Sequence, residues 1–393
     1  MKDSLLVFGG GILQLSIINK AKELGYLTVV IDPDTKAFSK KNADVFIEVK
    51  GDDFQKTMDI AIKYNVKGII TSATDHPILM MCNIASELNL SFPSFSSCET
   101  LLNKGKFKTF LKENNLPHAK GYVSFMGDII NEKDFIFPVI IKPTINSGSR
   151  GVIKCDDYIN LQNSIHETLT FSKDNSFIIE EFIEGDEISV EAIVFKNKVN
   201  IIQITDKIVT PPPYNVELGH IQPSKYFTKF EKIETLLQKI VDLTGLNNCA
   251  IHPELKIYKD KITIIEIGPR LGGDCITSKL VPLSTGINIE ELVINMAVNK
   301  NLSYKIDNKA SFISYLNFPV NKVVKGTISE LELIKVFPEV IEFNHNLLIG
   351  ETIKPITNSL NRYGYYIAQS DNVELIKKIS NKINDYIIKR FLN

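Results

Sequence analysis

The segment CAIHPELKIYKDKITIIEIGPRLGG, residues 249–273, decides the fold. Two apolar runs of strand-forming residues flank the short polar turn Lys259-Asp260-Lys261, which predicts a β-hairpin. Each predicted strand carries one carboxylate among aliphatic residues, Glu254 in the first and Glu266 in the second. Burying an uncompensated carboxylate costs on the order of several kcal/mol. Because Mg2+ selects oxygen ligands, the two acids predict a metal site that faces bound phosphate, and the alternative is a pair of acids on a solvated sheet face.

The length of the turn predicts the register of this hairpin. If Tyr258 pairs with Ile262 around a three-residue turn, Glu254 lies directly opposite Glu266. A two-residue turn would pair Glu254 with Ile265 and send the acids to opposite faces. We therefore expect a three-residue turn and two carboxylates on one face of the sheet.

Basic residues around the hairpin extend the predicted site. Arg270 follows Glu266 in a Gly-Pro-Arg turn, where its planar guanidinium suits phosphate or a developing oxyanion. His220, in ELGHIQPS, and His252 are candidate hydrogen-bond donors near the substrate. A lone histidine is more often an incidental hydrogen-bonding residue, so these two assignments are the weaker part of the prediction.

An upstream strand leads into a loop that suits an anion. The apolar run 137–141 places Lys142 at its end, just before the loop TINSGSRG, residues 144–151. Glycines let backbone N–H groups turn toward phosphate, and hydroxyl and basic side chains add donors. The predicted phosphate-contacting residues of this loop are Ser147, Gly148, Ser149 and Gly151. The alternative is an exposed hairpin tip with solvated charges.

The next apolar strand ends in acidic residues. In FIIEEFIEGDEISVEAIV, residues 177–194, the backbone from Glu180 to Ile183 could present N–H and C=O groups to a purine edge. Glu187 could then accept hydrogen bonds from ribose hydroxyl groups. Read by itself, this stretch is more typical of an ordinary hairpin with surface acids.

The first hundred residues alternate short apolar strands with helical patterns. Strands are expected at 5–8, 28–31, 45–49 and 68–71, with helices at 12–24, 54–64 and 78–88. This order predicts a doubly wound parallel sheet. Gly25 and Asp32 invite a dinucleotide-binding interpretation, but GGGILQ lacks the GxGxxG pattern, and a plain glycine turn is the favoured explanation.

The chain length of 393 residues predicts several packed units. We expect an N-terminal α/β domain at 1–100, a central domain at 101–300 of α+β character with a small lobe at 118–190, and a C-terminal unit at 301–393. The Lys-rich stretch 101–115 reads as one helix, and the chain from there to about Val199 as strands and turns. Further helices are expected at 230–243 and 373–391.

Composition limits the classes of function. The net charge of -1 provides no general attraction for nucleic acid or an anionic membrane. Five cysteines without a CxxC pair favour a reduced cytoplasm over a disulfide framework or a structural zinc site. The N-terminal residues run directly into a predicted strand, so we expect no leader peptide, and no segment reaches the length of a membrane span.

Taken in order, these motifs resemble the ATP-grasp superfamily, in particular its L-amino acid ligases and biotin-carboxylase-like enzymes. The resemblance rests on GGGILQ with VVIDPD, LLNKGKFKTFLKENNLP, VIIKPTINSGSRG, IIEEFIEGDEISVE, ELKIY with IEIGPRLGGD, and GYYIAQSDNVELIKKI. It implies that ATP phosphates contact Lys104 and Lys142, and that Glu180, Glu181 and Ile183 contact adenine. It also implies ribose at Glu187, Mg2+ or Mn2+ at Glu254 and Glu266, and a catalytic Arg270. Many relatives have Asn where this chain has Gly268, which removes a third side-chain ligand.

The resemblance implies an ATP-dependent ligase that joins a small-molecule carboxylate, such as an amino acid, to an amine through an acyl phosphate. It also allows a homodimer. A second interpretation is a carboxylase acting on aminoimidazole ribonucleotide, because such enzymes have a similar GGG turn and DPD strand end. A third, non-enzymatic interpretation is an NAD-binding sensor built on the first domain.

Overall fold

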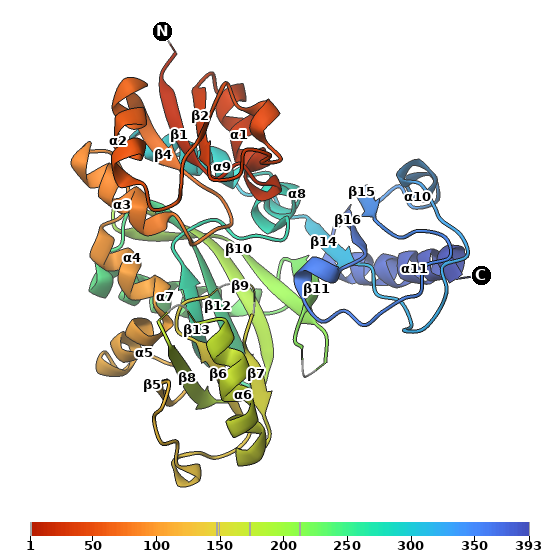
Figure 1. Cartoon of the computed structure of the whole chain (residues 1–393). Helices are drawn as coiled ribbons and strands as arrows, with labels where there is room; N and C mark the ends of the chain where they lie inside the picture. Colours follow the sequence, from red (N-terminus) through yellow and green to blue (C-terminus); the bar gives the residue numbers. More distant parts are fainter. Residues whose placement is uncertain (1, 147, 149, 173, 212–213, 393) are drawn as a thin grey trace.

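The computed structural model describes residues 2–146, 148, 150–172, 174–211 and 214–392 (Figure 1). Its strands form an N-terminal four-stranded sheet, a central eight-stranded sheet and a second four-stranded sheet. The last of these is called the small sheet below. Within the described residues, none of the helices combines the length and apolar character that crossing a membrane requires.

The N-terminal sheet is parallel, with strand order β3-β2-β1-β4. Its elements are β1 (Ser4–Phe8), α1 (Leu15–Glu23), β2 (Leu27–Asp32), β3 (Val45–Glu48), α2 (Phe54–Lys63), β4 (Val66–Ile70) and α3 (Ile78–Glu87). Leu5 and Val7 pack with α1 and α9 (Ile289–Ala297), whereas Leu6 and Phe8 pack with α2 and α3. Both faces are therefore covered, which explains the continuous apolar run of β1 and confirms the predicted doubly wound sheet.

The central sheet is antiparallel, with strand order β13-β12-β9-β10-β11-β14-β16-β15. Its strands are β9 (Asp186–Phe195), β10 (Lys198–Val209), β11 (Glu217–Gln222), β12 (Cys249–Tyr258), β13 (Lys261–Gly268), β14 (Ala310–Tyr315), β15 (Val340–His345) and β16 (Gly364–Ser370). Helix α7 (Phe230–Thr244) covers one face, and α8 (Val281–Thr285) and α9 cover the other.

The C-terminal strands continue the central sheet, because β14 pairs with β11. Helices α10 (Glu330–Val336) and α11 (Val373–Leu392) complete this region, and α11 buries its apolar face on β14 and β16. Figure 1 shows the region projecting to the right of the N-terminal sheet and the small sheet. The continuous sheet holds C-terminal side chains at a defined place beside the centre of the molecule.

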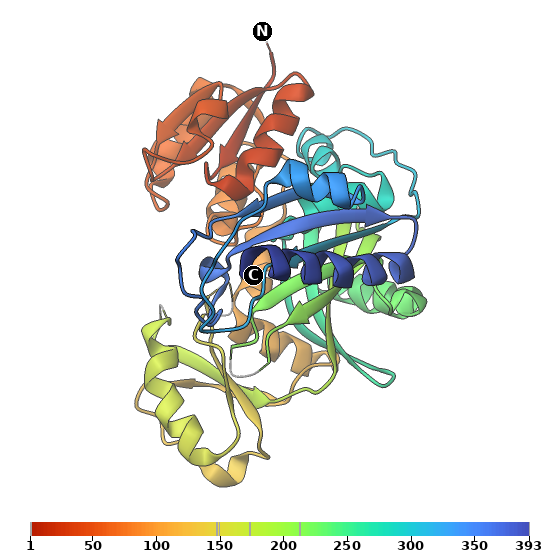
Figure 2. The same ribbon diagram turned by 90° about the vertical axis from the view of Figure 1, so that its right-hand side faces the viewer.

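The small sheet has strand order β5-β8-β6-β7 and forms a lobe of its own, seen at the lower left of Figure 2. Its elements are β5 (Gly121–Phe125), β6 (Val139–Pro143), β7 (Ile153–Cys155), α6 (Tyr158–Thr170) and β8 (Ser176–Glu181). A separate apolar core lies between the sheet and α6. The sequence interpretation of this region as strands and turns missed α6, whose N-terminus is capped by Asp157.

The Lys-rich stretch forms two helices and not one. Helix α4 (Phe95–Leu102) ends at Asn103, whose side chain accepts hydrogen bonds from the N–H groups of Gly105 and Lys106 and so begins α5 (Lys104–Glu113). An Asn side chain competes with the helical backbone in this way, which makes it a good N-cap and a poor interior residue. The break sets Lys104 at the first turn of α5.

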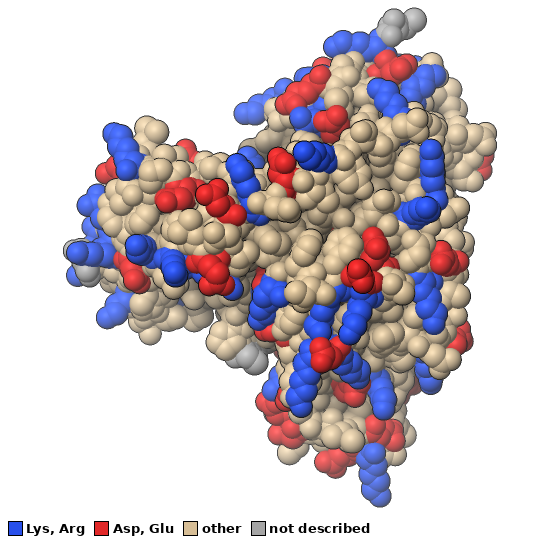
Figure 3. Space-filling model, turned by 180° about the vertical axis from the view of Figure 1, so that it is seen from behind, with Lys and Arg blue, Asp and Glu red and all other residues tan. Residues whose placement is uncertain are grey.

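Surface charge is mixed on the face shown in Figure 3. Lys and Arg side chains gather where the lower lobe joins the rest of the molecule, with Asp and Glu side chains between them. This intermingling agrees with the small net charge of -1.

Packing of β4 against α9 depends on Gly68. A Cβ atom at this position would lie 2.7 Å from the backbone oxygen of Ala297 and 2.9 Å from its carbonyl carbon. We predict that Gly68→Ala lowers the free energy of unfolding by about 1–3 kcal/mol, because the backbone must shift to accept the methyl group. Urea denaturation measures the change. Lys67→Ala, at an exposed neighbour on the same strand, is the control; equal stability of the two variants would contradict the prediction.

Candidate active site

A cavity of about 490 Å3 lies where the three sheets meet. Its walls combine loops of the N-terminal region, the start of α5, the small sheet, strands β9 to β13 and Ser359 of the C-terminal region. Twelve of the sequence-predicted site residues line it: Lys104, Lys142, Gly148, Glu180, Glu181, Ile183, Glu187, His220, His252, Glu254, Glu266 and Arg270. The fold thus gathers residues that are up to 166 positions apart in the sequence (270 − 104).

Three of the predicted loop residues do not appear on this wall. Ser147 and Ser149 lie outside the described residues. Gly151 adopts φ +73°, and a Cβ atom there would lie 2.9 Å from the Phe171 ring. The need for glycine at position 151 is therefore explained by packing as well as by backbone conformation.

Glu180 holds two lysines beneath the small sheet. Its Oε1 lies 2.5 Å from Lys142 Nζ and its Oε2 lies 2.5 Å from Lys108 Nζ. Burial alone raises the pKa of Glu180, but Lys142 and Lys108 outweigh burial and lower the pKa overall. Burial lowers the pKa of Lys108, although Glu180 opposes this change. Both carboxylate oxygens are occupied, so a purine at this wall would be contacted by backbone groups and not by the Glu180 carboxylate.

Lys104 joins the hairpin to the predicted phosphate loop. Its Nζ lies 3.0 Å from Glu266 Oε2 and donates a hydrogen bond to the backbone oxygen of Asn146 at 2.8 Å. Its backbone N–H donates to the carbonyl oxygen of Thr144 at 3.0 Å. Lys104 is therefore held at the point where a phosphate, the loop and the acid pair would meet.

The acids of the hairpin pair as expected, but for a different reason. Glu254 is paired with Glu266, which confirms the predicted register at these positions. The predicted three-residue turn is wrong, because Tyr258 pairs with Lys261 around a two-residue turn. A β-bulge at Ile265, between the pairs Leu255–Ile264 and Glu254–Glu266, adds the residue that restores a common face.

The acid pair is compensated by lysines. Lys104 lies beside Glu266, and Lys207 Nζ lies 3.2 Å from Glu254 Oε2. Burial raises the pKa of Glu254, but Lys207 and His252 lower it well below its usual range. Among the described residues, three or more His, Cys, Asp or Glu side chains nowhere gather into a metal-binding group. Two carboxylates nevertheless fit Mg2+, which commonly takes one or two carboxylates and completes its shell with water and nucleotide phosphate oxygens.

Four residues were not found from the sequence: Lys207, Asp75 and Asp274 of this wall, and Glu191, which contacts the wall residue His252. Lys207 is buried on β10, with Nζ 2.5 Å from Glu187 Oε1 and 3.7 Å from Glu217 Oε1. A lysine inside the apolar run of β10 was the available signal. Burial lowers the pKa of Lys207, but its three carboxylate neighbours raise it well above the usual value.

Glu191 pairs with a predicted donor. His252 Nδ1 lies 2.8 Å from Glu191 Oε1, and both side chains are buried. Burial lowers the pKa of His252, yet Glu191 and Glu254 raise it to about 9. His252 is thus a cation beside Glu254 at neutral pH.

Two arginine–aspartate pairs lie at the cavity wall. Arg270 Nε donates to Asp75 Oδ1 at 2.6 Å, and its Nη2 donates to Asp75 Oδ2 at 3.3 Å, which ties the hairpin to the N-terminal region. Asp274 is paired with Arg362 of the C-terminal region and lies 3.4 Å from His220 Nε2. Each pair joins two regions of the chain across the cavity wall.

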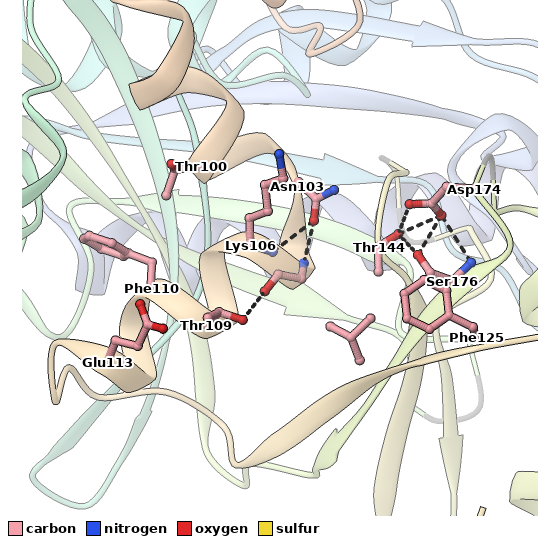
Figure 4. A pocket seen from close by; sticks show the side chains of 12 residues that line it. Thr100, Asn103, Lys106, Thr109, Phe110, Glu113, Phe125, Thr144, Asp174 and Ser176 are labelled. Carbon is pink, nitrogen blue, oxygen red and sulfur yellow. Dashed lines mark hydrogen bonds between the residues drawn. The ribbon is translucent and has the colours of Figure 1, made fainter. Parts of the chain in front are cut away.

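A second cavity of about 500 Å3 lies between α5 and the small sheet (Figure 4). In Figure 4, Thr144 and Ser176 point toward Asp174, whose carboxylate accepts hydrogen bonds from both hydroxyl groups. Ser172 Oγ also donates to this carboxylate. These polar groups satisfy one another, so we assign this cluster a structural role in holding Thr144, two residues beyond Lys142.

The dinucleotide-binding interpretation gains no support from the N-terminal loop. Asp32 accepts hydrogen bonds from the N–H groups of Gly10 and Asp34, both at 2.7 Å. Gln14 Nε2 donates to the backbone oxygen of Ser72 at 2.5 Å. These side chains fix the glycine turn and join it to the loop after β4.

Comparison with known proteins agrees with the fold. Residues 135–278 match the ATP-grasp domain family. The carbamoyl phosphate synthase large chain of Clostridium acetobutylicum is 27% identical over 315 residues, which are 73% of this chain and 28% of that protein. This chain therefore spans less than a third of that relative.

Two solved structures superimpose over nearly the whole chain. An L-amino acid ligase from Bacillus licheniformis has a TM-score of 0.81 at 20% identity and covers 98% of this chain, with 97% of its own length covered. A phosphoribosylglycinamide synthetase from Anaerococcus prevotii has a TM-score of 0.74 at 23% identity and covers 100% of this chain, with 99% of its own length covered. The predicted ATP-grasp fold is confirmed.

The buried Lys108–Glu180–Lys142 cluster makes a prediction about stability. Glu180→Gln leaves two buried ammonium groups without a counter-charge, and we expect it to lower the free energy of unfolding by about 3–5 kcal/mol at neutral pH. The pKa of Glu180 is lower in the folded than in the unfolded state. The ionised carboxylate therefore contributes fully to the free energy of unfolding above the unfolded-state pKa of about 4.3, and this contribution is lost as the pH falls through the folded-state pKa. The difference between wild type and variant should therefore shrink in acid.

Chemical denaturation at neutral and acidic pH checks both parts. The control is Glu99→Gln, which removes the exposed partner of Lys106 and should change stability by less than about 1 kcal/mol. A Glu180→Gln protein as stable as this control at neutral pH would contradict the buried-charge argument.

Proposed function

Because residues 135–278 form an ATP-grasp domain in a chain that has the ATP-grasp fold, we propose that the protein is an ATP-dependent carboxylate–amine ligase that releases ADP and phosphate. One observation carries the proposal. The paired acids Glu254 and Glu266, the lysines Lys104 and Lys142, and Arg270 all face the same cavity. This combination of anionic metal ligands and cationic phosphate ligands suits phosphoryl transfer, which needs positioning and charge neutralisation more than covalent help from the protein.

In the first step, the γ-phosphoryl group passes from ATP to a carboxylate oxygen of the substrate. The new P–O bond forms as the bond to ADP breaks. Lys142 and Lys104 would bind the phosphates, and their present glutamate partners keep both ammonium groups in place before nucleotide arrives. Mg2+ held by Glu254 and Glu266 would neutralise charge on the phosphate oxygens.

In the second step, an amine attacks the carbonyl carbon of the acyl phosphate. The C–N bond forms, the amine loses a proton and phosphate leaves. Arg270 would stabilise the oxyanion, and Asp75 fixes its guanidinium by two hydrogen bonds. The roles of these residues rest on the resemblance and on their shared cavity.

Charge at the substrate end of the cavity favours an amino acid over a ribonucleotide. The acids Asp75, Glu217 and Asp274 lie on this wall. The arginines nearby are already committed, Arg270 to Asp75 and Arg362 to Asp274. A ribonucleotide phosphate would have to be bound beside these carboxylates, whereas an ammonium group would be attracted to them. The likeness to the Bacillus licheniformis L-amino acid ligase supports the same choice.

The carboxylase interpretation remains the second candidate because of the GGG turn and the likeness to an N5-carboxyaminoimidazole ribonucleotide synthetase from Thermotoga maritima. An ADP-release screen separates the two. Paired amino acids should stimulate ADP release, whereas bicarbonate with aminoimidazole ribonucleotide should not. The opposite result would favour the carboxylase.

We predict that spent nucleotide is ADP with phosphate, because the resemblance to ATP-grasp enzymes implies that both lysines and the acid pair act on the terminal phosphates. Chromatography of the reaction with an active substrate pair checks this. Accumulation of AMP and pyrophosphate would instead indicate adenylation and rule out the acyl-phosphate route.

We predict that Glu266→Gln lowers kcat by about a hundredfold or more, since loss of one metal ligand removes several kcal/mol of charge stabilisation in the transition state. Steady-state assays over a range of Mg2+ concentrations measure the effect, and thermal unfolding checks that the variant is folded. Asp260→Asn, in the exposed turn of the same hairpin, is the matched control. Full Mg2+-dependent activity in Glu266→Gln would end the metal-site assignment.

A further inference from the structure

Asp274 occupies an unusual stretch of backbone at the end of the cavity. Asp274 and Cys275 adopt φ +49° and φ +60°, so two successive residues other than glycine lie in the left-handed region. A π-helical turn, Ile276–Leu280, follows directly. Left-handed residues with side chains and π-helical turns both cost conformational free energy and concentrate at functional sites. The backbone is held in a costly form that places the Asp274 carboxylate on the cavity wall.

Arg362 fixes that carboxylate from the C-terminal region. Its Nη1 donates to Asp274 Oδ2 at 3.0 Å and its Nη2 donates to Oδ1 at 2.8 Å. Its Nε donates to the backbone oxygen of Ser359 at 3.0 Å, and its guanidinium stacks on the Tyr315 ring at 3.6 Å. Most donors of Arg362 are therefore in use. Arg362 orients Asp274 and has little capacity left to bind a substrate itself.

His220 gives a second, independent sign of a ligand. Its side chain lines the cavity and is 1% exposed, and its Nε2 lies 3.4 Å from Asp274 Oδ2. Its Nδ1 is buried and has no hydrogen-bond partner within the described part of the chain. A buried polar atom without a partner is costly, so a bound molecule at this point is expected to supply one.

Asp274 still has room to accept hydrogen bonds. An ionised carboxylate offers about four acceptor sites, of which Arg362 takes two and His220 Nε2 lies near a third. The side chain is 27% exposed, and the cavity is the space it faces. A cationic group of the substrate would complete its coordination.

We propose that Asp274 binds the ammonium group of the amino acid whose carboxylate is activated, and that Arg362 is a positioning residue for this contact. The proposal rests on the proposed ligase function and names its substrate class. The bound ammonium belongs to the carboxylate donor, because an attacking amine must lose its proton and contact with an anion favours the protonated form. Asp274 thereby also keeps the donor's own amino group from acting as the nucleophile.

The test compares amino acids with analogues that lack the amino group. The protein L-amino acids are scanned one by one for ADP release and for thermal shift with wild type. Whichever responds is then paired with its des-amino carboxylic acid. For Asp274→Asn we expect KM for the amino acid to rise roughly tenfold to a hundredfold. KM for the des-amino acid and the Kd of ATP should stay close to wild type.

Arg362→Lys is the second variant, because it keeps the positive charge but loses the bidentate geometry. It should raise KM for the amino acid by a smaller factor with little change in kcat, which separates positioning from a general loss of fold. Asp371→Asn is the matched control, since Asp371 is an exposed aspartate of the same C-terminal region that does not line the cavity.

Failure of this inference is distinguishable from failure of the ligase proposal. If wild type releases ADP with amino acids and Asp274→Asn leaves KM unchanged, or Asp371→Asn raises KM to the same extent, the assignment of Asp274 is overturned and the ligase function stands. If no amino acid supports ADP release, the ligase proposal fails, and loss of amino-acid thermal shift in Asp274→Asn still decides the binding role. If Asp274→Asn does not fold, an unchanged amino-acid KM in Arg362→Lys overturns the proposal.

Discussion

Compensation of buried charge is the constraint on which the rest of the structure depends. A charge removed from water costs several kcal/mol unless an opposite charge and hydrogen bonds replace the solvent. The cavity meets this condition with five ion-paired groups: Lys108–Glu180–Lys142, Lys104–Glu266, Lys207–Glu254, Arg270–Asp75 and Arg362–Asp274. The protein can therefore keep a dense set of charged side chains in place around the cavity without a bound ligand. On binding, phosphate would take the place of the glutamates beside the lysines, and Mg2+ would take the place of the lysines beside the glutamates.

The same pairs bind the regions of the chain together. Arg270, just after the hairpin, is paired with Asp75 of the N-terminal region. Asp274, in the same segment after the hairpin, is paired with Arg362 of the C-terminal region. Arg362 lies two residues before β16, which pairs with β14, and β14 in turn extends the central sheet. The substrate end of the cavity is consequently a product of all three regions, and a change in any one of them alters its shape and charge.

The hairpin shows how a correct prediction can rest on an incomplete argument. Alternation of side chains along the strands, together with an assumed three-residue turn, predicted that Glu254 and Glu266 share a face. The turn is one residue shorter than expected, and the bulge at Ile265 compensates for it. A bulge has no distinct sequence pattern in an isoleucine-rich strand, since any of these residues can be left unpaired. Helix α6 was also missed, because its apolar pattern is weak. The helix break at Asn103 was missed too, although Asn is a favourable N-cap, because the hydrogen bonds of its side chain decide that α5 begins there.

By itself, the sequence determined the parallel N-terminal sheet, the hairpin with its two acids, the order of the ATP-grasp motifs and part of the set of residues that line the cavity, among them Lys104, Lys142 and Arg270. These features depend on periodicity and on short-range chemistry, which neighbouring residues carry together. Only the tertiary structure decided that Lys108 and Lys142 share Glu180, that Lys207 neutralises Glu254, and that Arg362 reaches Asp274 from 88 positions away. The physical reason is that a buried charge is compensated by whichever opposite charge the fold brings within a few ångströms, and sequence separation places no limit on that choice.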